Sequence, residues 1–216
     1  MFIELVGSLR CVRAHPPEWL VAAADVMEAR DIVTGTLGCP TCGTRYPIER
    51  GIADFRDGHA GPGVPTSAGD DPELAVRTAA LLGLDQPGGF VVLCGTWGGA
   101  APALGGLVER MHVLVLDGPA ALESGGGVSL ARSAGEIPVR AMAARGIALD
   151  AAHADERGLA SAAAALRPGG RLIAPATVPL PDGMEELARD ESIWVAKRVA
   201  GSGEVVRLSV VRGGRA

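Results

Sequence analysis

The sequence predicts an α/β protein in two parts, a small metal-binding N-terminal module and an open, mostly parallel sheet. Short-spaced cysteines lie near the N-terminus, and apolar strand-like runs alternate with helical patterns in the rest of the chain. Between these parts, residues 57–71 read DGHAGPGVPTSAGDD, a composition typical of linkers. We therefore expect a module at 1–56, a linker at 57–71 and a second domain at 72–216.

The second domain is expected to alternate strands and helices. Asp71-Pro72-Glu73 supplies the cap, the first-turn proline and the early acid of a helix start, which leads into ELAVRTAALLGL. FVVLCG at 90–95 has the form of a buried parallel strand. The further elements expected in chain order are a helix at about 100–110, strands at 112–118, 127–133 and 146–152, a helix at 155–166 and a strand at 171–178.

The C-terminal part departs from this alternation. SIWVAKRVA and EVVRLSVV flank Gly201-Ser202-Gly203, the pattern of a β-hairpin. We expect this terminal hairpin to add an antiparallel strand at one edge of the sheet.

Composition and charge exclude several classes of function. The formal charge of −5 argues against independent nucleic-acid binding, which needs a concentrated basic face; Arg10 and Arg13 form only a local basic pair. The uncharged stretch 86–108 is long enough for a membrane span but contains seven glycines and two prolines, so a strand–turn–helix fits it better. No targeting signal is predicted, and four cysteines do not form a secreted disulfide pattern, so we expect a cytoplasmic protein.

Four potential metal ligands lie in the N-terminal module, namely Cys11, His15, Cys39 and Cys42. A C-x3-H pair and a C-x2-C pair can each hold one side of a tetrahedral zinc ion, and three thiolates with one imidazole leave no open position for catalysis. Two alternatives remain. CPTC can be a redox pair, although GTRYPIERGI follows it where a redox motif normally has a helix. The thiols can also be buried and unligated, with His15 on the surface.

The segment SLRC…GTLGCPTCGTRYPIERGIADF resembles the short zinc-binding activator proteins of methyltransferases and their bacterial relatives, over about residues 5–55. The resemblance implies a zinc-ribbon-like module that stabilises a methyltransferase, here within the same chain. The family has C-P-x-C at its first pair, whereas this chain has Cys11-Val12-Arg13-Ala14, so that His15 takes the place of the missing ligand.

A glycine-rich turn, CGTWGGAAPAL, follows the first strand of the second domain. Such a turn lets a nucleotide-type cofactor approach the backbone closely, beside the free amides of a helix N-terminus. Asp117 ends the second strand, where a carboxylate can accept both hydroxyls of a ribose. EIPV at 136–139 and LRPGGRLIAP at 166–175 follow in order.

This ordered set resembles the class I S-adenosylmethionine-dependent methyltransferases, over about residues 72–211. The resemblance implies a Rossmann-like fold and a cofactor site in which Asp117 binds the ribose and Ser133 stands at the adenine edge. The family's acid-x-Gly-x-Gly-x-Gly loop corresponds here to Leu93, Gly95, Trp97 and Gly99. The acid that meets the methionine amine is therefore absent, and an indole replaces the central glycine.

The altered loop leaves two hypotheses for the cofactor. Either the loop is rearranged and S-adenosylmethionine still binds, or the fold persists as a scaffold without catalysis, because an indole fills the space that glycine leaves open. Candidate catalytic groups are few. Asp150, His153 and Asp155 cluster after the fourth strand, where a general base is conceivable, but the simpler interpretation is that they cap the next helix and face solvent.

The sequence thus leads to three function hypotheses. The first is a methyltransferase-like enzyme with an unidentified acceptor and a weakened or lost cofactor site. The second is a non-catalytic regulatory protein that binds a protein partner and keeps a structural zinc. A third is a redox-responsive module that uses Cys39 and Cys42.

Overall fold

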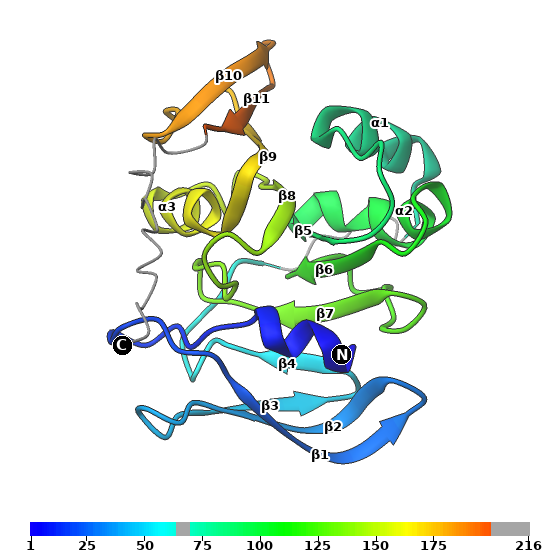
Figure 1. Cartoon of the computed structure of the whole chain (residues 1–216), viewed down its shortest axis with the longest axis vertical. Coiled ribbons are helices and arrows are strands. Elements are labelled where there is room, and N and C mark those ends of the chain that lie inside the picture. The colour runs from blue at the N-terminus through cyan, green and yellow to red at the C-terminus, as the bar shows by residue number, and fades with distance from the viewer. Residues whose placement is uncertain (64–69, 200–216) are drawn as a thin grey trace, which may run out of the picture.

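A single eleven-stranded mixed sheet runs through the protein, as the computed structural model shows for residues 1–63 and 70–199 (Figure 1). Its strand order is β1-β2-β3-β4-β7-β6-β5-β8-β9-β11-β10. The strands are β1 Val21–Glu28, β2 Asp31–Gly38, β3 Arg45–Glu49, β4 Ile52–Asp54, β5 Phe90–Cys94, β6 His112–Leu116, β7 Val128–Arg132, β8 Ala144–Ala148, β9 Leu166–Pro175, β10 Met184–Arg189 and β11 Ile193–Arg198.

The N-terminal module joins this sheet directly. Strands β1 to β4 form an antiparallel meander, and β4 then pairs parallel with β7, with Ile52 opposite Leu130 and Asp54 opposite Arg132. The module and the following α/β part therefore share backbone hydrogen bonds. The expected boundary after residue 56 stays a prediction, but the two parts are not separate sheets.

The central strands form a doubly wound arrangement. Strands β5 to β9 are all parallel, and in order of appearance they lie as 3-2-1-4-5 across the sheet. In such sheets ligands bind beyond the carboxyl ends of the strands, where the strand order reverses. Here the reversal falls between β5 and β8, so the expected glycine-rich loop after β5 lies at that crevice.

The predicted helices of this part are confirmed with shifted ends. Helix α1 covers Pro72–Leu82; the Asp71 carboxylate accepts the Leu74 amide at 2.9 Å and Gly83 ends the helix with a φ of +63°. Helix α2 covers Ala101–Leu107 and α3 covers Glu156–Ala165. The fifth strand, β9, begins at Leu166 directly after α3, five residues earlier than expected, because LRPGG pairs with β8 across an irregular register.

Different segments cover the two faces of the sheet. On one face, Val91 and Val113 pack with α1 and α2, while on the other Val92 and Leu114 pack with α3 and the N-terminal segment. The connections 117–127 and 133–143, both fully described, contain no helix. The 3-10 helix η1 (Ile3–Ser8) and residues 9–12 lie there instead, held by hydrogen bonds such as Arg10 N–H to the Pro138 carbonyl (3.0 Å). On this face of the sheet, the N-terminal segment therefore lies where helices would otherwise pack.

Only the first strand of the predicted C-terminal hairpin lies within the described residues. Strand β11, which contains the predicted segment IWVAKR, pairs antiparallel with β10 on one side and with β9 on the other. The expected turn at 201–203 and its second strand lie outside the described residues. Strand β10, MEELAR, was not predicted because it is charged and alternates poorly. The Asp190 carboxylate accepts the Ser192 and Ile193 amides (2.7 and 2.8 Å) and so closes the β10–β11 turn.

Across residues 1–63 and 70–199, no helix combines the length and the hydropathy needed to cross a membrane.

Candidate metal centre and cofactor crevice

The four predicted metal ligands come together. The ligand atoms of Cys11, His15, Cys39 and Cys42 all lie within 4.8 Å of one another. The Sγ atoms of Cys11 and Cys42 are 3.7 Å apart, and His15 Nε2 is 3.5 Å from the Cys39 Sγ. With zinc bonds of about 2.3 Å to sulfur and about 2.05 Å to nitrogen, tetrahedral geometry places such atoms about 3.8 and about 3.6 Å apart. The residues therefore fit a tetrahedral metal ion.

Local backbone geometry explains the C-x2-C half of the cluster. Cys39 follows β2, and the Gly43 amide donates to the Cys39 carbonyl at 2.9 Å, closing a knuckle in which Gly43 has a φ of +73°. A side chain at Gly43 would be strained in this left-handed conformation. Strand β3 begins at Arg45, so no helix follows the motif, and the helix dipole that activates redox pairs is missing.

The thiols of the cluster differ in their electrostatic surroundings. Hydrogen bonds between the Cys42 sulfur and Thr44 lower the pKa of Cys42 to about 6, which favours the thiolate that metals bind. Burial raises the pKa of Cys11, whose sulfur lies 3.1 Å from the Tyr46 hydroxyl. The buried Tyr46 hydroxyl also accepts the Val12 amide at 3.3 Å. Sequence reasoning missed this outer-sphere tyrosine, because its position beside Cys11 follows only from the pairing of β2 with β3.

The predicted cofactor loop forms the 3-10 helix η2 (Gly95–Ala100). Gly95 has a φ of +58°, and a Cβ placed on it would lie 1.8 Å from an Asp150 carboxylate oxygen. That carboxylate instead accepts the Thr96 amide at 3.1 Å. The Gly99 carbonyl accepts the Asp71 amide at 2.9 Å and so ties the loop to the start of α1. The Asp150 carboxylate therefore occupies the space that Gly95 leaves open.

The Trp97 indole is buried, with 8% of its surface exposed. Its Nε1–H donates to the Leu149 carbonyl at 3.2 Å, and the ring packs with the apolar residues beneath α1 and α2. Leu149 follows β8, so this hydrogen bond crosses the point where the strand order reverses. Leu93, which we expected at the position of a cofactor-binding acid, is fully buried on the same side of the sheet.

Asp117 and Ser133 lie together at the carboxyl ends of β6 and β7. The Asp117 carboxylate accepts hydrogen bonds from the Ser133 amide (3.1 Å) and hydroxyl (3.2 Å). The same carboxylate contacts His153 Nε2 at 3.2 Å. Only 4% of Asp117 is exposed and Ser133 is also buried. Both predicted cofactor residues are thus engaged within the protein.

His153 links two carboxylates. Its ring is fully buried, and its Nδ1 lies 2.6 Å from Asp150 while its Nε2 faces Asp117. Burial opposes a charge on the ring, but the hydrogen bonds to Asp117 and Asp150 outweigh it and raise the pKa of His153 to about 9. Burial also acts to raise the pKa of Asp150, but His153 brings it below its usual value. At neutral pH the network therefore holds an imidazolium between two carboxylates.

The three acidic and basic groups after β8 divide into two roles. Asp155 caps α3, because its carboxylate accepts the Gly158 amide at 2.7 Å, as the simpler interpretation predicted. For His153 and Asp150 that interpretation was wrong, since both turn inward to Thr96 and Asp117. The loop 149–155 after β8 allows this reversal, and its direction could not be read from the sequence.

Comparisons with known proteins place the chain near methyltransferases in coarse architecture. No protein-family model and no curated protein matches the sequence. Similar solved structures include the MycE methyltransferase of the mycinamycin pathway (10% identity, 69% of this chain and 54% of that chain, TM-score 0.44). Others are the pyocyanin biosynthetic protein PhzM (17%, 59% and 55%, 0.39) and an S-adenosyl-L-methionine methyltransferase from Silicibacter pomeroyi (14%, 59% and 93%, 0.39).

The chain spans about half the length of the first two of these proteins. It is a mixed α/β protein with class I methyltransferase neighbours and a Cys/His cluster that can hold a metal. All three TM-scores are below 0.5, so its function has to be argued from its own side chains.

Proposed function

We propose that this chain is a non-catalytic, methyltransferase-like protein that binds a protein partner, with a structural zinc in its N-terminal module. One observation carries the proposal. Asp117, the carboxylate expected to bind the ribose of S-adenosylmethionine, is buried and engaged by Ser133 and His153. Because the polar groups of the crevice already form hydrogen bonds with one another, few remain to bind a cofactor.

Opening this crevice for a ligand would be costly. A ribose could reach Asp117 only if His153 moved, which would separate a buried imidazolium from two carboxylates. Removing one member of a buried charge pair typically costs about 3–5 kcal/mol. The ligand would also have to displace the Trp97 indole from the Leu149 carbonyl. S-adenosylmethionine would therefore bind, if at all, with affinity reduced by roughly two orders of magnitude or more.

The zinc part of the proposal is supported by the donor set. The ion would have four protein ligands, Cys11, His15, Cys39 and Cys42. These fill all four tetrahedral positions, so none remains for water or substrate. The ion would tie the loop after η1 to the knuckle between β2 and β3. Residues 1–12 also cover one face of the parallel strands. Zinc would therefore stabilise both parts of the chain.

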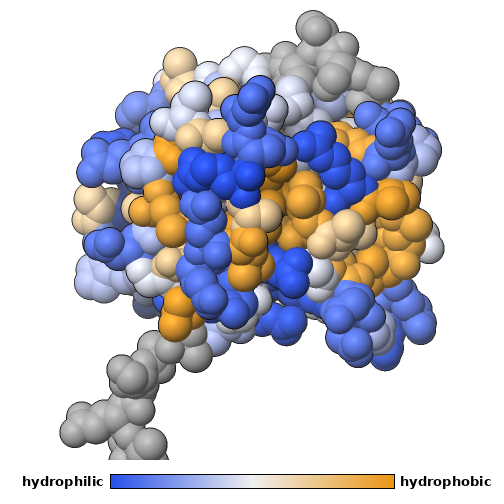
Figure 2. Space-filling model, turned by 90° about the horizontal axis from the view of Figure 1, so that it is seen from above, coloured by the Kyte–Doolittle hydropathy of each residue, from blue (hydrophilic) through white to orange (hydrophobic). Residues whose placement is uncertain are grey.

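Exposed apolar surface supports the proposal that this protein binds a protein partner. Strand β1 is an edge strand, and all of its residues except Ala22 are exposed. Val21 and Val26 are 57% and 49% exposed, and the preceding Trp19 is 59% exposed. An edge strand with exposed apolar side chains offers backbone groups with which a partner strand can pair. At the opposite end, which carries α1 and β10, apolar side chains gather among hydrophilic ones (Figure 2), and Val76 of α1 is 57% exposed.

A calorimetric titration with S-adenosylmethionine tests the loss of the cofactor site. We expect no saturable heat up to millimolar concentration and no thermal stabilisation. The double variant Trp97→Gly/His153→Ala, if folded by circular dichroism, should gain measurable binding because it vacates the crevice. Saturable binding to the unaltered protein below about 100 μM would contradict the proposal.

A strand-disrupting substitution tests the partner surface. Val26→Lys on β1 should reduce capture of a partner from a lysate several-fold, because a buried charge opposes strand pairing. Leu107→Lys is the matched control, since Leu107 is apolar and 50% exposed, close to the 49% of Val26, but lies on α2. Equal loss with both variants, or none with Val26→Lys, would argue against β1.

The second candidate function is a methyltransferase whose crevice opens on binding. It is favoured by one feature, the retention of Asp117 and Gly95 with left-handed backbone (φ +50° and +58°) at the carboxyl ends of β6 and β5. The same titration separates the two candidates.

A further inference from the structure

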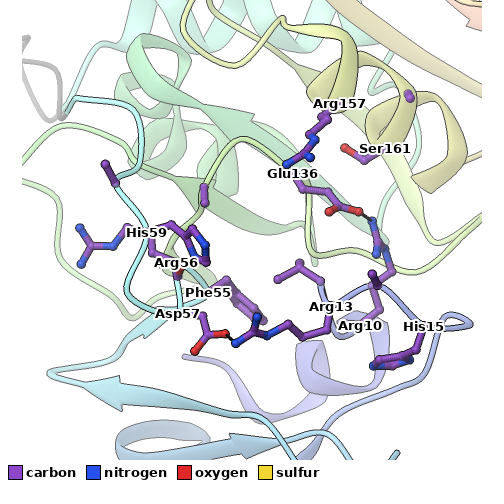
Figure 3. A pocket seen from close by; sticks show the side chains of 15 residues that line it. Arg10, Arg13, His15, Phe55, Arg56, Asp57, His59, Glu136, Arg157 and Ser161 are labelled. Atoms are coloured by element: carbon purple, nitrogen blue, oxygen red, sulfur yellow. Dashed lines mark hydrogen bonds and ion pairs between the residues drawn. The ribbon is translucent and has the colours of Figure 1, made fainter. Parts of the chain in front are cut away.

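A pocket of about 750 Å³ lies between the N-terminal module and α3, and the crevice residues Gly95, Asp117 and Ser133 do not line it (Figure 3). Its size falls within the range of small-molecule sites, roughly 300–1,000 Å³. Four segments line it: the loop after η1 with Arg13, the segment after β4 with His59, the connection after β7 with Glu136, and α3 with Arg157. The pairing of β4 with β7 and the hydrogen bond from the Arg10 amide to the Pro138 carbonyl hold these segments together, so the pocket belongs to the junction of the two parts.

The lining of this pocket is basic. Four arginines line it against two carboxylates, Asp57 and Glu136, which leaves an excess of positive charge even with His15 and His59 neutral. Its other lining groups are mostly apolar, among them Val12, Phe55 and Ala160. This combination suits a small molecule with an anionic group and an apolar body.

Not all of the arginines are available to a ligand. Arg10 is used fully within the protein, since it pairs with Glu136 (2.5 Å) and donates to the Val139 carbonyl (3.1 Å). Arg56 donates through Nε and Nη2 to Asp54, which does not line the pocket. Arg13 pairs with Asp57 at the wall of the pocket.

Arg157 is different from the other three. Within residues 1–63 and 70–199 its guanidinium makes neither an ion pair nor a hydrogen bond, and Figure 3 shows it reaching toward the pocket from α3. Across from it, His59 Nδ1 contacts the Arg56 carbonyl at 2.9 Å, which leaves Nε2 for a ligand. The groups that remain for an anion are therefore Arg157, His59 Nε2 and the guanidinium nitrogens of Arg13 that do not pair with Asp57.

We propose that this pocket binds a small organic phosphate of about mononucleotide size, with Arg157 as the principal cation. An arginine fork can bind a carboxylate or a phosphate bidentately. A tetrahedral phosphate, however, directs oxygens to several sides at once, whereas a carboxylate presents two oxygens on one side. Because the three donors come from three segments around the pocket, phosphate uses them better. The ligand would join the N-terminal module to α3.

Calorimetric titration of the full chain tests the site, with adenosine 5′-monophosphate and ribose 5-phosphate as probes. Adenosine controls for binding through the base and ribose, including binding at the cofactor crevice, and succinate controls for a carboxylate dianion. We expect both phosphates to bind saturably and to raise the melting temperature, and adenosine and succinate to bind at least about tenfold more weakly.

Variants then locate the binding. Arg157→Ala should weaken both phosphates about tenfold or more, because it removes a charge-assisted hydrogen bond. Arg110→Ala is the matched control, an exposed arginine that does not line the pocket, and should change the affinity by less than about twofold. Arg157 is exposed, so its replacement should leave the fold intact.

Three outcomes would overturn the proposal: no saturable phosphate binding, equal effects of the two arginine variants, or succinate binding as tightly as phosphate. The proposed lack of a cofactor site is tested separately, because S-adenosylmethionine carries no phosphate. Either proposal can therefore fail without the other.

Discussion

The Nε2 atom of His153 lies 3.2 Å from the Asp117 carboxylate, and both side chains are closed off from solvent. Asp150 holds the other ring nitrogen at 2.6 Å. A histidine thus stands at the carboxylate where a cofactor ribose was expected, and this pairing determines both the chemistry and the stability of the crevice.

The stability of the protein should fall at alkaline pH because of His153. Its pKa is about 9 in the folded protein against about 6.5 in an unfolded chain, so its contribution is complete below about pH 6.5 and is lost as the pH rises through 9. The full contribution is about 3 kcal/mol. Urea unfolding at pH 6, 8 and 10 should show this fall, and His153→Gln should remove most of it. An equally steep fall in the variant would assign the effect to other groups.

Two substitutions at Trp97 should separate packing from hydrogen bonding. Trp97→Phe keeps most of the apolar contact but leaves the Leu149 carbonyl without its donor, which should cost about 1–2 kcal/mol of unfolding free energy. Trp97→Ala also creates a cavity under α1 and should cost about 3–5 kcal/mol. Denaturant titration measures both values, and equal losses would show that the hydrogen bond dominates.

Removal of metal should unfold the N-terminal module. Protein purified without chelator should contain about one zinc per chain by elemental analysis, and a strong chelator should lower its melting temperature. Cys39→Ala should abolish the zinc, while Cys94→Ala, a buried cysteine outside the cluster, should retain it. A metal-free protein with unchanged stability would exclude the structural zinc.

Tyr46 should act on the metal through Cys11. Tyr46→Phe removes the hydroxyl that lies 3.1 Å from the Cys11 sulfur but keeps the ring packed against Phe55. Loss of an outer-sphere partner typically lowers metal affinity about 10- to 100-fold. Competition with a chromogenic chelator should show this change with the melting temperature of the zinc-loaded protein reduced only slightly. Unchanged affinity would make Tyr46 a packing residue alone.

Features of the chain that depend on short sequence separations were predictable. The helix start at Asp71-Pro72 and the cap at Asp155 follow from contacts between residues three apart. The C-x2-C knuckle likewise depends on one tight turn at Gly43. In each case a few neighbouring residues satisfy one another, so the pattern in the sequence is itself the structural cause.

Features that depend on distant pairings were not predictable in this way. The edge strand β10 has no apolar alternation of its own and forms because β11 offers it backbone partners. Asp117 and His153 are 36 residues apart, and nothing near either one indicates that they meet.

The sequence by itself therefore determined the C-x2-C knuckle, the helix caps and the alternation of strands with helices, because local geometry fixes each of them. Only the tertiary structure decided that the N-terminal segment covers the sheet, that β4 joins β7, and that His153 and Trp97 turn into the crevice. These long-range contacts depend on which buried polar groups hydrogen-bond and which apolar groups pack together across the fold. Alternative pairings can be compared only when the whole chain is packed.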